Sequence, residues 1–358
     1  MMQAGFLFTT CQLGAEAVLK AETLRAFPDF RFAFSRPGFL TFKISDERYQ
    51  NADTLREFFA RTVFSRSAAF SVEKITDVGS VWKVLDERNL PVNRLHVFQR
   101  DPAVPGDGFE PGPTADDLAA HRTLIESCPA PQRLGIGADD LRLPAQPGEA
   151  VADIVRVDDG QWFLGVHFVD KVSPLQMRYS GGMVPIILPS DAVSRAWLKF
   201  EEGLRWSEFP IGFGSRCADI GAAPGGASQT LLARGAKVHG IDPADIDPIV
   251  LRHPNFEHVR GRIRQVKRTV FRKVRWIIAD MNVAPGYVLD VLEELLTRQD
   301  VDVRGLLFTL KLFQWELAED IPAAIELIKR WGFNRVAAKQ LAFNRQEIMV
   351  AASRGLLR

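Results

Sequence analysis

The sequence predicts an α/β protein in which a doubly wound, mostly parallel sheet follows an α+β region. Three observations support this fold class. From residue 216 onward short apolar strands alternate with helical stretches, a glycine-rich turn follows the first of these strands, and the first half of the chain carries strands and helices of its own. A length of 358 residues suits two domains. We place them at residues 1–180 and 181–358, with the change near Gly181 and Gly182.

Strands and helices are both expected in the first half. A helix that opens after Gly14 and ends before Pro28 would carry an apolar stripe of Val18, Leu19 and Leu24. The other expected elements are strands at residues 4–10, 38–44 and 95–99, a helix at residues 52–63 and a proline- and glycine-rich loop at residues 101–113.

A hairpin is expected at residues 150–169. Its turn is Asp158-Asp159-Gly160, and its second arm alternates through Trp162, Leu164, Val166 and Phe168.

The second half predicts the parallel sheet. Ser190 or Asp191 can cap a helix that runs to about Trp206. Helical runs separate most of the strand candidates, which are residues 217–220, 237–242, 276–280, 306–311, 335–339 and 348–352.

Composition narrows the class of protein. Apolar content of 46% and charged content of 25% are ordinary for a globular protein, and no run approaches 18 apolar residues, so neither a membrane span nor a secretory signal is expected. The three cysteines, Cys11, Cys128 and Cys217, are too scattered for a disulfide framework or a zinc site, so no metal is expected and a reducing cytoplasm is the simplest location. With a net charge of +1, an RNA partner would have to be bound by local basic patches.

The segment RCADIGAAPGGASQTLLARG carries the sharpest local signal, because a short strand, a loop of small residues and a helix follow one another. Small residues let the backbone approach a ligand. Asp242, which comes 21 residues after Gly221 at the end of the next strand, can accept hydrogen bonds from both hydroxyls of a ribose. The expected cofactor-binding residues are Asp219, Gly221, Ala222, Ala223, Pro224, Gly225, Gly226, Asp242 and Asp280.

The cofactor of this site is expected to contain an adenosine but no phosphates. A dinucleotide site would favour G-x-G-x-x-G, and a P-loop would need G-K-[ST]; this loop reads G-A-A-P-G-G. S-adenosylmethionine meets this description. The alternative to a cofactor site is a tight turn that only connects a strand to a helix.

Four polar residues stand in otherwise apolar surroundings. Lys199 lies in the expected helix AWLKFEE, Asp280 and Lys311 end strands, and Glu347 opens the last strand. The carboxyl ends of parallel strands line the ligand crevice of such a sheet, and a lysine that ends a buried strand is costly unless it is paired or used. Taken singly, Lys199 and Glu347 would be read as ordinary surface or ion-pair residues.

In this order, Lys199, Asp280, Lys311 and Glu347 resemble the tetrad of the FtsJ/RrmJ-type ribose 2′-O-methyltransferases, and the whole chain is similar to one branch, the RlmM family of 23S rRNA methyltransferases. The resemblance is carried by SRAWLKFEE, DIGAAPGGASQ, IIADM, FTLKL and NRQEIMV, and more weakly by FTTCQLGAEAVLKAE. It implies a Rossmann-like, S-adenosylmethionine-dependent domain that follows a THUMP-like, ferredoxin-like region for holding RNA, and a cytidine target.

The resemblance also implies roles for the four residues. Lys311 would be the base, or the group that stabilises the developing alkoxide, and Asp280 would orient it and balance the sulfonium. Lys199 and Glu347 would position the ribose. Burial and the neighbouring Lys199 are expected to lower the pKa of Lys311, while Asp280 opposes that shift.

Two other methylation chemistries fit less well. Methylation of an exocyclic amine favours an Asn/Asp-Pro-Pro-aromatic loop where this chain reads Asp280-Met281-Asn282-Val283. Methylation at pyrimidine C5 needs a cysteine nucleophile, and Cys217 lies in a strand where it is expected to be core.

A basic stretch follows the third strand region. Between Arg260 and Arg275 there are eight lysines and arginines in sixteen residues and no acid, so it can contact RNA phosphates; the alternative is a solvated helix face with Ile263, Val266, Val270 and Val274 at helical spacing. Related enzymes usually have an acidic residue for the adenine near the place where this chain has Gly261 and Arg262.

The expected function is therefore ribose 2′-O-methylation of large-subunit rRNA in the cytoplasm. The alternatives are an RNA-binding ribosome-assembly protein with an inactive methyltransferase fold, and a methyltransferase for another acceptor such as a base nitrogen.

Overall fold

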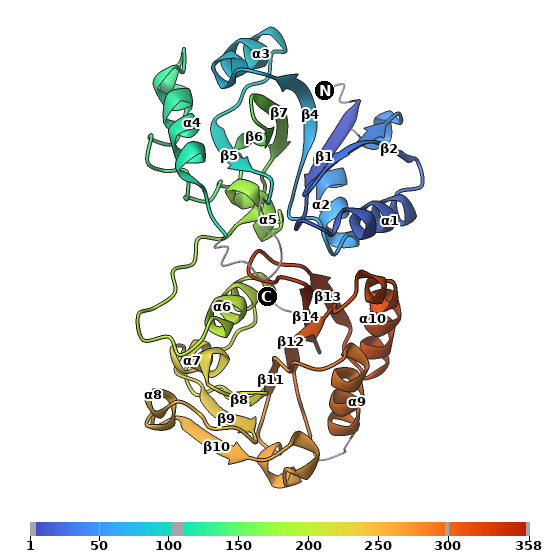
Figure 1. Cartoon of the computed structure of the whole chain (residues 1–358), viewed down its shortest axis with the longest axis vertical. Coiled ribbons are helices and arrows are strands. Elements are labelled where there is room, and N and C mark those ends of the chain that lie inside the picture. The colour runs from blue at the N-terminus through green and yellow to red at the C-terminus, as the bar shows by residue number, and fades with distance from the viewer. Residues whose placement is uncertain (1–4, 50, 102–110, 298–300, 356–358) are drawn as a thin grey trace. The chain divides into compact units, whose positions relative to one another are not determined.

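The computed structural model describes residues 5–49, 51–101, 111–297 and 301–355. The chain divides into two compact units, Met1–Pro185 and Ile186–Arg358, which are described separately (Figure 1). The turn at Ser180–Gly182, where the sequence suggested a boundary, lies inside the first unit. Its serine hydroxyl donates to the carbonyl of Val97 at 2.9 Å, and a side chain at Gly182 would collide with the backbone of Arg66.

The first unit opens with the β-α-β-β-α-β order of ferredoxin-like folds. Its strands pair antiparallel in the spatial order β2-β3-β1-β4, which confirms the ferredoxin-like part of the prediction. These elements are β1 (Phe6–Thr10), α1 (Glu16–Ala26), β2 (Phe30–Arg36), β3 (Phe39–Ile44), α2 (Ala52–Arg61) and β4 (Ser67–Ile75). In α1 only Leu19 of the expected stripe is fully buried, and Val18 and Leu24 are half-buried.

The same sheet continues beyond β4 to seven strands, in the order β2-β3-β1-β4-β7-β6-β5. The sequence did not predict β2, β4, α3 or α4, and the expected loop at residues 101–113 falls largely outside the described residues. The added elements are α3 (Val81–Glu87), β5 (Arg94–Gln99), α4 (Ala115–Glu126), β6 (Ala150–Asp158), β7 (Gln161–Phe168) and α5 (Leu175–Arg178).

The predicted hairpin is β6 and β7, paired from Ala150 and Phe168 to Asp158 and Gln161. Strand β7 lies between β4 and β6 in the sheet. Both of its faces carry buried residues, whereas the alternating pattern predicted a single buried face. Leu164 packs in one apolar cluster and Phe163 in another. The apolar alternation therefore identified the strand but not the second covered face.

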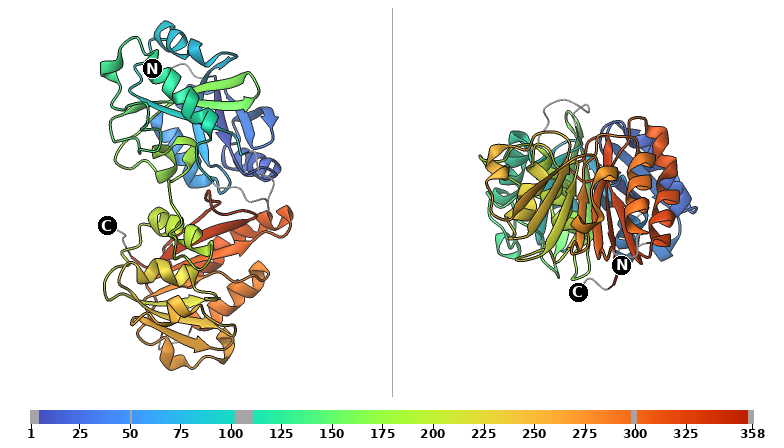
Figure 2. Two further views of the ribbon diagram at one scale, coloured as in Figure 1. Left: turned by 60° about the vertical axis from the view of Figure 1, so that its left-hand side comes forward. Right: turned by 90° about the horizontal axis from the view of Figure 1, so that it is seen from below.

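The second unit is a doubly wound sheet with the strand order β10-β9-β8-β11-β12-β14-β13 (Figures 1 and 2). Strands β8 to β12 run parallel, and β14 runs antiparallel to β12 and β13. Its strands are β8 (Arg216–Ile220), β9 (Lys237–Asp242), β10 (Phe256–Arg260), β11 (Trp276–Ala279), β12 (Gly305–Lys311), β13 (Arg335–Lys339) and β14 (Glu347–Ser353). The predicted fold class is confirmed.

Helices cover both faces of this sheet, as Figure 2 shows. Every residue of β12 before Lys311 is buried, so the alternate residues of this strand enter apolar layers on opposite faces. The helices are α6 (Ala196–Ser207), α7 (Gly226–Leu232), α8 (Pro248–Leu251), α9 (Pro285–Leu296) and α10 (Ile321–Arg330).

This unit differs from the sequence prediction in three places. Helix α6 begins at Ala196, because the Gln229 side chain holds the preceding segment by accepting from the N–H of Val193 and donating to the carbonyl of Asp191. Strand β10 was not predicted. The stretch from Arg260 to Arg275 is not an α-helix but two short 3₁₀ turns.

Among the described residues, no helix is long and apolar enough to cross a membrane.

Candidate active site

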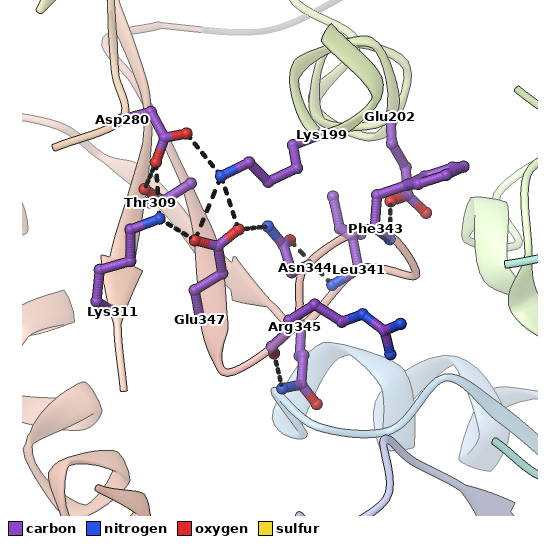
Figure 3. A network of polar contacts seen from close by, with 11 residues as sticks. Lys199, Glu202, Asp280, Thr309, Lys311, Leu341, Phe343, Asn344, Arg345 and Glu347 are labelled. Atoms are coloured by element: carbon purple, nitrogen blue, oxygen red, sulfur yellow. Dashed lines mark hydrogen bonds and ion pairs between the residues drawn. The ribbon is translucent and has the colours of Figure 1, made fainter. Parts of the chain in front are cut away.

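The topology of the second unit brings the four predicted catalytic residues together. Strands β11 and β12 are parallel neighbours, so Asp280, directly after β11, lies beside Lys311, the last residue of β12. Strand β14 runs back along β12 and places Glu347 directly opposite Lys311. Helix α6 supplies Lys199 from the layer above the sheet (Figure 3).

The four side chains form a closed ring of alternating charge. The Nζ atom of Lys199 lies 2.6 Å from Asp280 Oδ2 and 3.1 Å from Glu347 Oε1. The Nζ atom of Lys311 lies 2.9 Å from Asp280 Oδ1 and also contacts Glu347 Oε2. Each side chain is at most 17% exposed, so these ion pairs are weakly screened by water. Two lysines and two carboxylates leave the ring with no net charge.

Asp280 is held strongly in its ionised form. Burial by itself would raise its pKa, but the charges of Lys199 and Lys311 outweigh burial and lower the pKa to about 2. Thr309, two residues before Lys311 on β12, adds a hydroxyl that donates to Asp280 Oδ1 at 2.7 Å.

The pKa of Lys311 is raised, contrary to the expected lowering. Burial does act to lower it, as predicted, but Glu347 and Asp280 act in the opposite direction and outweigh burial. The prediction counted Asp280 but not Glu347, because the register between β12 and β14 is not visible in the sequence. Lys311 is therefore an ammonium in this structure.

A second layer of polar residues, which the sequence did not single out, supports Glu347 (Figure 3). The side-chain amide of Asn344 donates to Glu347 Oε1 at 3.2 Å and accepts from the N–H of Leu341 at 3.2 Å. Glu202 on α6 is 1% exposed and accepts from the N–H groups of Ala342 and Phe343 at 3.0 and 2.9 Å. The available signal was the spacing of Lys199 and Glu202, three residues apart and so on one side of the helix.

The predicted cofactor loop follows β8 at the point where strand order reverses, between β8 and β11. Gly221 has φ +82°, and a side chain there would meet the carbonyl oxygen of Asp280 at 2.7 Å. Gly225 has φ +124°, and Gly226 begins α7 against Ser194. The loop backbone therefore packs closely against Asp280 of the ring, and only glycine permits this approach at Gly221.

The other loop residues differ in their surroundings. Within the loop, Ala222 is buried, and its N–H donates to the carbonyl of Ile241 at 3.3 Å. Ala223 donates to Asp242 Oδ2 at 3.1 Å, and Pro224 is exposed at the crest of the loop.

Asp219 lies beneath the loop and is completely buried. Ser228 donates to its Oδ2 at 2.6 Å, and its Oδ1 has no hydrogen-bond partner within the described part of the chain. Burial raises its pKa to about 7, and the nearby carboxylates of Asp280 and Asp242 act in the same direction.

Asp242 ends β9 beside the loop. Its Oδ2 accepts from the N–H of Ala223, and its Oδ1 accepts from the N–H of Ala244 at 2.8 Å. Each oxygen keeps a further lone pair for a ligand. Gly261, which the family resemblance placed near the expected acidic residue, donates its N–H to the carbonyl of Asp242 at 3.2 Å.

Comparison with known proteins identifies the class. Residues 192–339 match the family described as FtsJ-like methyltransferase. This match lies within the second unit, and the chain is an S-adenosylmethionine-dependent methyltransferase.

Nearly the whole chain is similar to proteins named ribosomal RNA large subunit methyltransferase M, which confirms the predicted resemblance. The one from Edwardsiella ictaluri is 27% identical over 365 residues, covering 96% of this chain and 91% of the relative. The one from Tolumonas auensis is 24% identical over 355 residues, covering 94% and 91%. The one from Halorhodospira halophila is 32% identical over 181 residues, covering 49% and 51%.

The residues around the loop fit this cofactor. Asp219, Asp242 and Asp280 stand at the carboxyl ends of three adjacent strands, around a loop that offers no lysine or arginine to the phosphates of a dinucleotide. S-adenosylmethionine instead brings a sulfonium and an ammonium, and Asp242 keeps acceptor capacity for its ribose hydroxyls.

Proposed function

We propose that this protein transfers a methyl group from S-adenosylmethionine to a ribose 2′-oxygen of large-subunit ribosomal RNA, in the cytoplasm. The observation that carries the proposal is the closed ring of Lys199, Asp280, Lys311 and Glu347 beside the cofactor loop. The RNA substrate is supported by the names of the relatives, and a cytidine target by the resemblance to their family.

The ring suits an alcohol acceptor. Bound S-adenosylmethionine supplies an electrophilic methyl group, so the protein must align the hydroxyl oxygen and manage one proton. The C–O bond forms as the S–C bond breaks, the sulfur keeps the bonding electron pair as a neutral thioether, and the hydroxyl proton passes to solvent water. In our proposal Lys311 Nζ donates to the 2′-oxygen and stabilises the charge that develops on it, while Asp280 and Glu347 fix that ammonium.

The raised pKa of Lys311 favours this electrostatic role over that of a free base. Lys199 and Glu347 form the opposite side of the ring, where they would position the ribose. The proposed cofactor residues are Asp219, Asp242, Asp280 and the loop from Gly221 to Gly226.

Part of the basic stretch remains a candidate RNA contact. Arg260 is paired with Asp245, and Arg264 forms a bidentate pair with Glu294. Lys267 is exposed, and it forms no ion pair with any residue that the structure describes. Its charge would neutralise an RNA phosphate.

The test uses the chemistry of the product. Ribose 2′-O-methylation removes the hydroxyl that cleaves RNA in alkali, so a gap in the alkaline ladder marks the methylated nucleotide. Purified protein, S-adenosylmethionine and large-subunit rRNA that lacks this modification should produce one new gap at a cytidine. A methylated product without any gap would indicate a base acceptor. RNA binding without methyl transfer would favour the alternative of an inactive assembly protein.

A further inference from the structure

A second, basic surface lies at the opposite edge of the catalytic sheet. A hollow of about 650 Å³ opens at the amino ends of β8, β11 and β12. Its lining includes four cations, Arg216, Lys273, Arg275 and Arg304. Phe213 also lines the hollow. We call these five residues the amino-edge hollow. It shares no residue with the catalytic ring or the cofactor loop.

Strand register places three of the arginines side by side. The N–H of Arg275 donates to the carbonyl of Arg216 at 2.9 Å, and the N–H of Arg304 donates to the carbonyl of Arg275 at 2.7 Å. Adjacent strands lie about 4.8 Å apart. Arg216 begins β8, and Arg275 and Arg304 directly precede β11 and β12, so the three arginines form a row although they are far apart in the sequence.

These cations are largely uncompensated. Arg275 has an acidic partner, Asp302 at 3.6 Å, and donates to backbone carbonyls. Arg216, Lys273 and Arg304 are exposed, and none of them has a side-chain hydrogen bond or ion pair with any residue that the structure describes. In the catalytic ring, by contrast, every charge is paired. A row of unpaired cations is a site for a polyanion.

Phe213 adds an aromatic surface to the hollow. Its side chain is 96% exposed, yet its backbone is fixed, because the N–H of Gly214 donates to the carbonyl of Gly235 at 3.0 Å. The ring lies against Gly235, where an added side chain would meet it at 3.1 Å. An unpaired nucleic-acid base can stack on an exposed aromatic ring that stands beside arginines.

We propose that the amino-edge hollow binds the RNA substrate at a point remote from the methylated nucleotide, with phosphates on Arg216, Lys273 and Arg304 and a base on Phe213. This inference rests on the proposed RNA function. Strand β12 spans seven residues from Gly305 to Lys311, so the hollow and the ring lie roughly 20 Å apart. Only an RNA larger than the target nucleotide and its neighbours can contact both.

The experiment compares two triple variants that remove the same charge from the same domain. The hollow variant, Arg216→Gln/Lys273→Gln/Arg304→Gln, removes the three unpaired cations of the hollow. The control variant, Arg260→Gln/Arg264→Gln/Lys329→Gln, removes three surface cations that already form ion pairs elsewhere. Binding of each full-length protein to unmodified large-subunit rRNA is measured over a range of salt concentrations. Three phosphate contacts should contribute about 2 to the slope of log affinity against log salt.

We expect the hollow variant to lose that part of the slope and to bind full-length rRNA about tenfold more weakly at moderate salt. The control should stay within twofold of the wild type, and both variants should bind S-adenosylmethionine normally in calorimetric titration. Phe213→Ala alone should weaken RNA binding about fivefold or more.

Activity on a short RNA separates this proposal from the proposed function. On the shortest rRNA fragment that the wild type methylates, the hollow variant should turn over normally, because such a fragment does not reach the amino edge. Wild-type affinity and slope in the hollow variant, or equal losses on short and full-length RNA, would overturn the proposal. A wild type that binds rRNA through the hollow but forms no 2′-O-methyl product would instead contradict the proposed function alone.

Discussion

The two edges of the catalytic sheet use charge in opposite ways. At the carboxyl edge, Lys199, Asp280, Lys311 and Glu347 are nearly buried and mutually paired. At the amino edge, Arg216, Lys273 and Arg304 are exposed. Buried charges must be compensated, which fixes them in a single arrangement that suits chemistry on one hydroxyl. Exposed cations carry little desolvation cost and suit a long, flexible polyanion. In our proposals, catalysis and remote RNA binding therefore lie at opposite edges of one sheet.

The largest effect is expected at Lys311. Replacing it with alanine removes the ammonium beside the 2′-oxygen and should lower methyl transfer by about 10³-fold or more, while rRNA affinity stays nearly unchanged. Single-turnover transfer and filter binding measure the two effects, and Lys329→Ala, an exposed lysine paired with Glu326, is the control. Substantial turnover in Lys311→Ala would remove Lys311 from the mechanism.

The pH profile sharpens the role of Lys311. Because its pKa is raised, it stays protonated through neutral pH, and an electrostatic role predicts a transfer rate that is nearly level from about pH 6.5 to 9. A free-base role predicts a rate that increases with pH over this whole range. The chemical step must be measured in single turnover so that product release does not mask it.

Glu202 should come next, as a positioning residue. Glu202→Gln removes a carboxylate that accepts two backbone N–H groups of the loop holding Asn344, so Glu347 loses its fixed position. We expect kcat to fall ten- to hundredfold with little change in KM for RNA. Glu201→Gln is the matched control, since Glu201 is also buried but pairs with Arg205 and Arg234. Equal losses of kcat in both variants would indicate general damage to α6.

A smaller effect is expected on cofactor affinity. Asp242→Ala removes the proposed acceptor of the ribose hydroxyls and should weaken binding of S-adenosylmethionine about tenfold or more in calorimetric titration. Asp245→Ala, which removes the exposed partner of Arg260 nearby, should bind normally. An unchanged affinity in Asp242→Ala would mean that the adenosine lies elsewhere.

The smallest effect concerns stability and pH. Burial raises the pKa of Asp219 to about 7 in the folded state, whereas the unfolded chain has the ordinary value. Ionising Asp219 between these two values therefore lowers the free energy of unfolding. The contribution of Asp219 to the free energy of unfolding should therefore decline as pH rises from about 4 to 7 and stay constant above pH 7. Asp219→Asn should lack this decline in urea unfolding without cofactor. The same pH dependence in the variant and the wild type would contradict the raised pKa.

Asp280 should show the opposite dependence. Its pKa is lowered to about 2, so its stabilising contribution is complete above about pH 4 and is lost as pH falls toward 2. Asp280→Asn should reduce stability at neutral pH and flatten the acid limb of the unfolding profile. Measuring both variants over the same pH range distinguishes an uncompensated buried carboxylate from one that two lysines compensate.

Features that depend on local order could be predicted from the amino-acid sequence alone. The strand, small-residue loop and helix around Gly221 are contiguous, and so is the apolar strand that delivers Lys311, so their patterns can be read directly. The order of the four ring residues was enough to suggest the family. The alternative reading of Arg260 to Arg275 as a helix does not hold, because the helical spacing of its apolar residues also fits short 3₁₀ turns.

Features that depend on the register between strands are visible only in the folded chain. The pairing of β12 with β14 places Glu347 against Lys311 and so reverses the expected direction of its pKa shift. The contact between Glu202 and the loop at residues 342–343 joins segments about 140 residues apart, which no local pattern encodes. The arginine row arises in the same way, because each strand contributes one arginine and only the hydrogen bonds between strands align them.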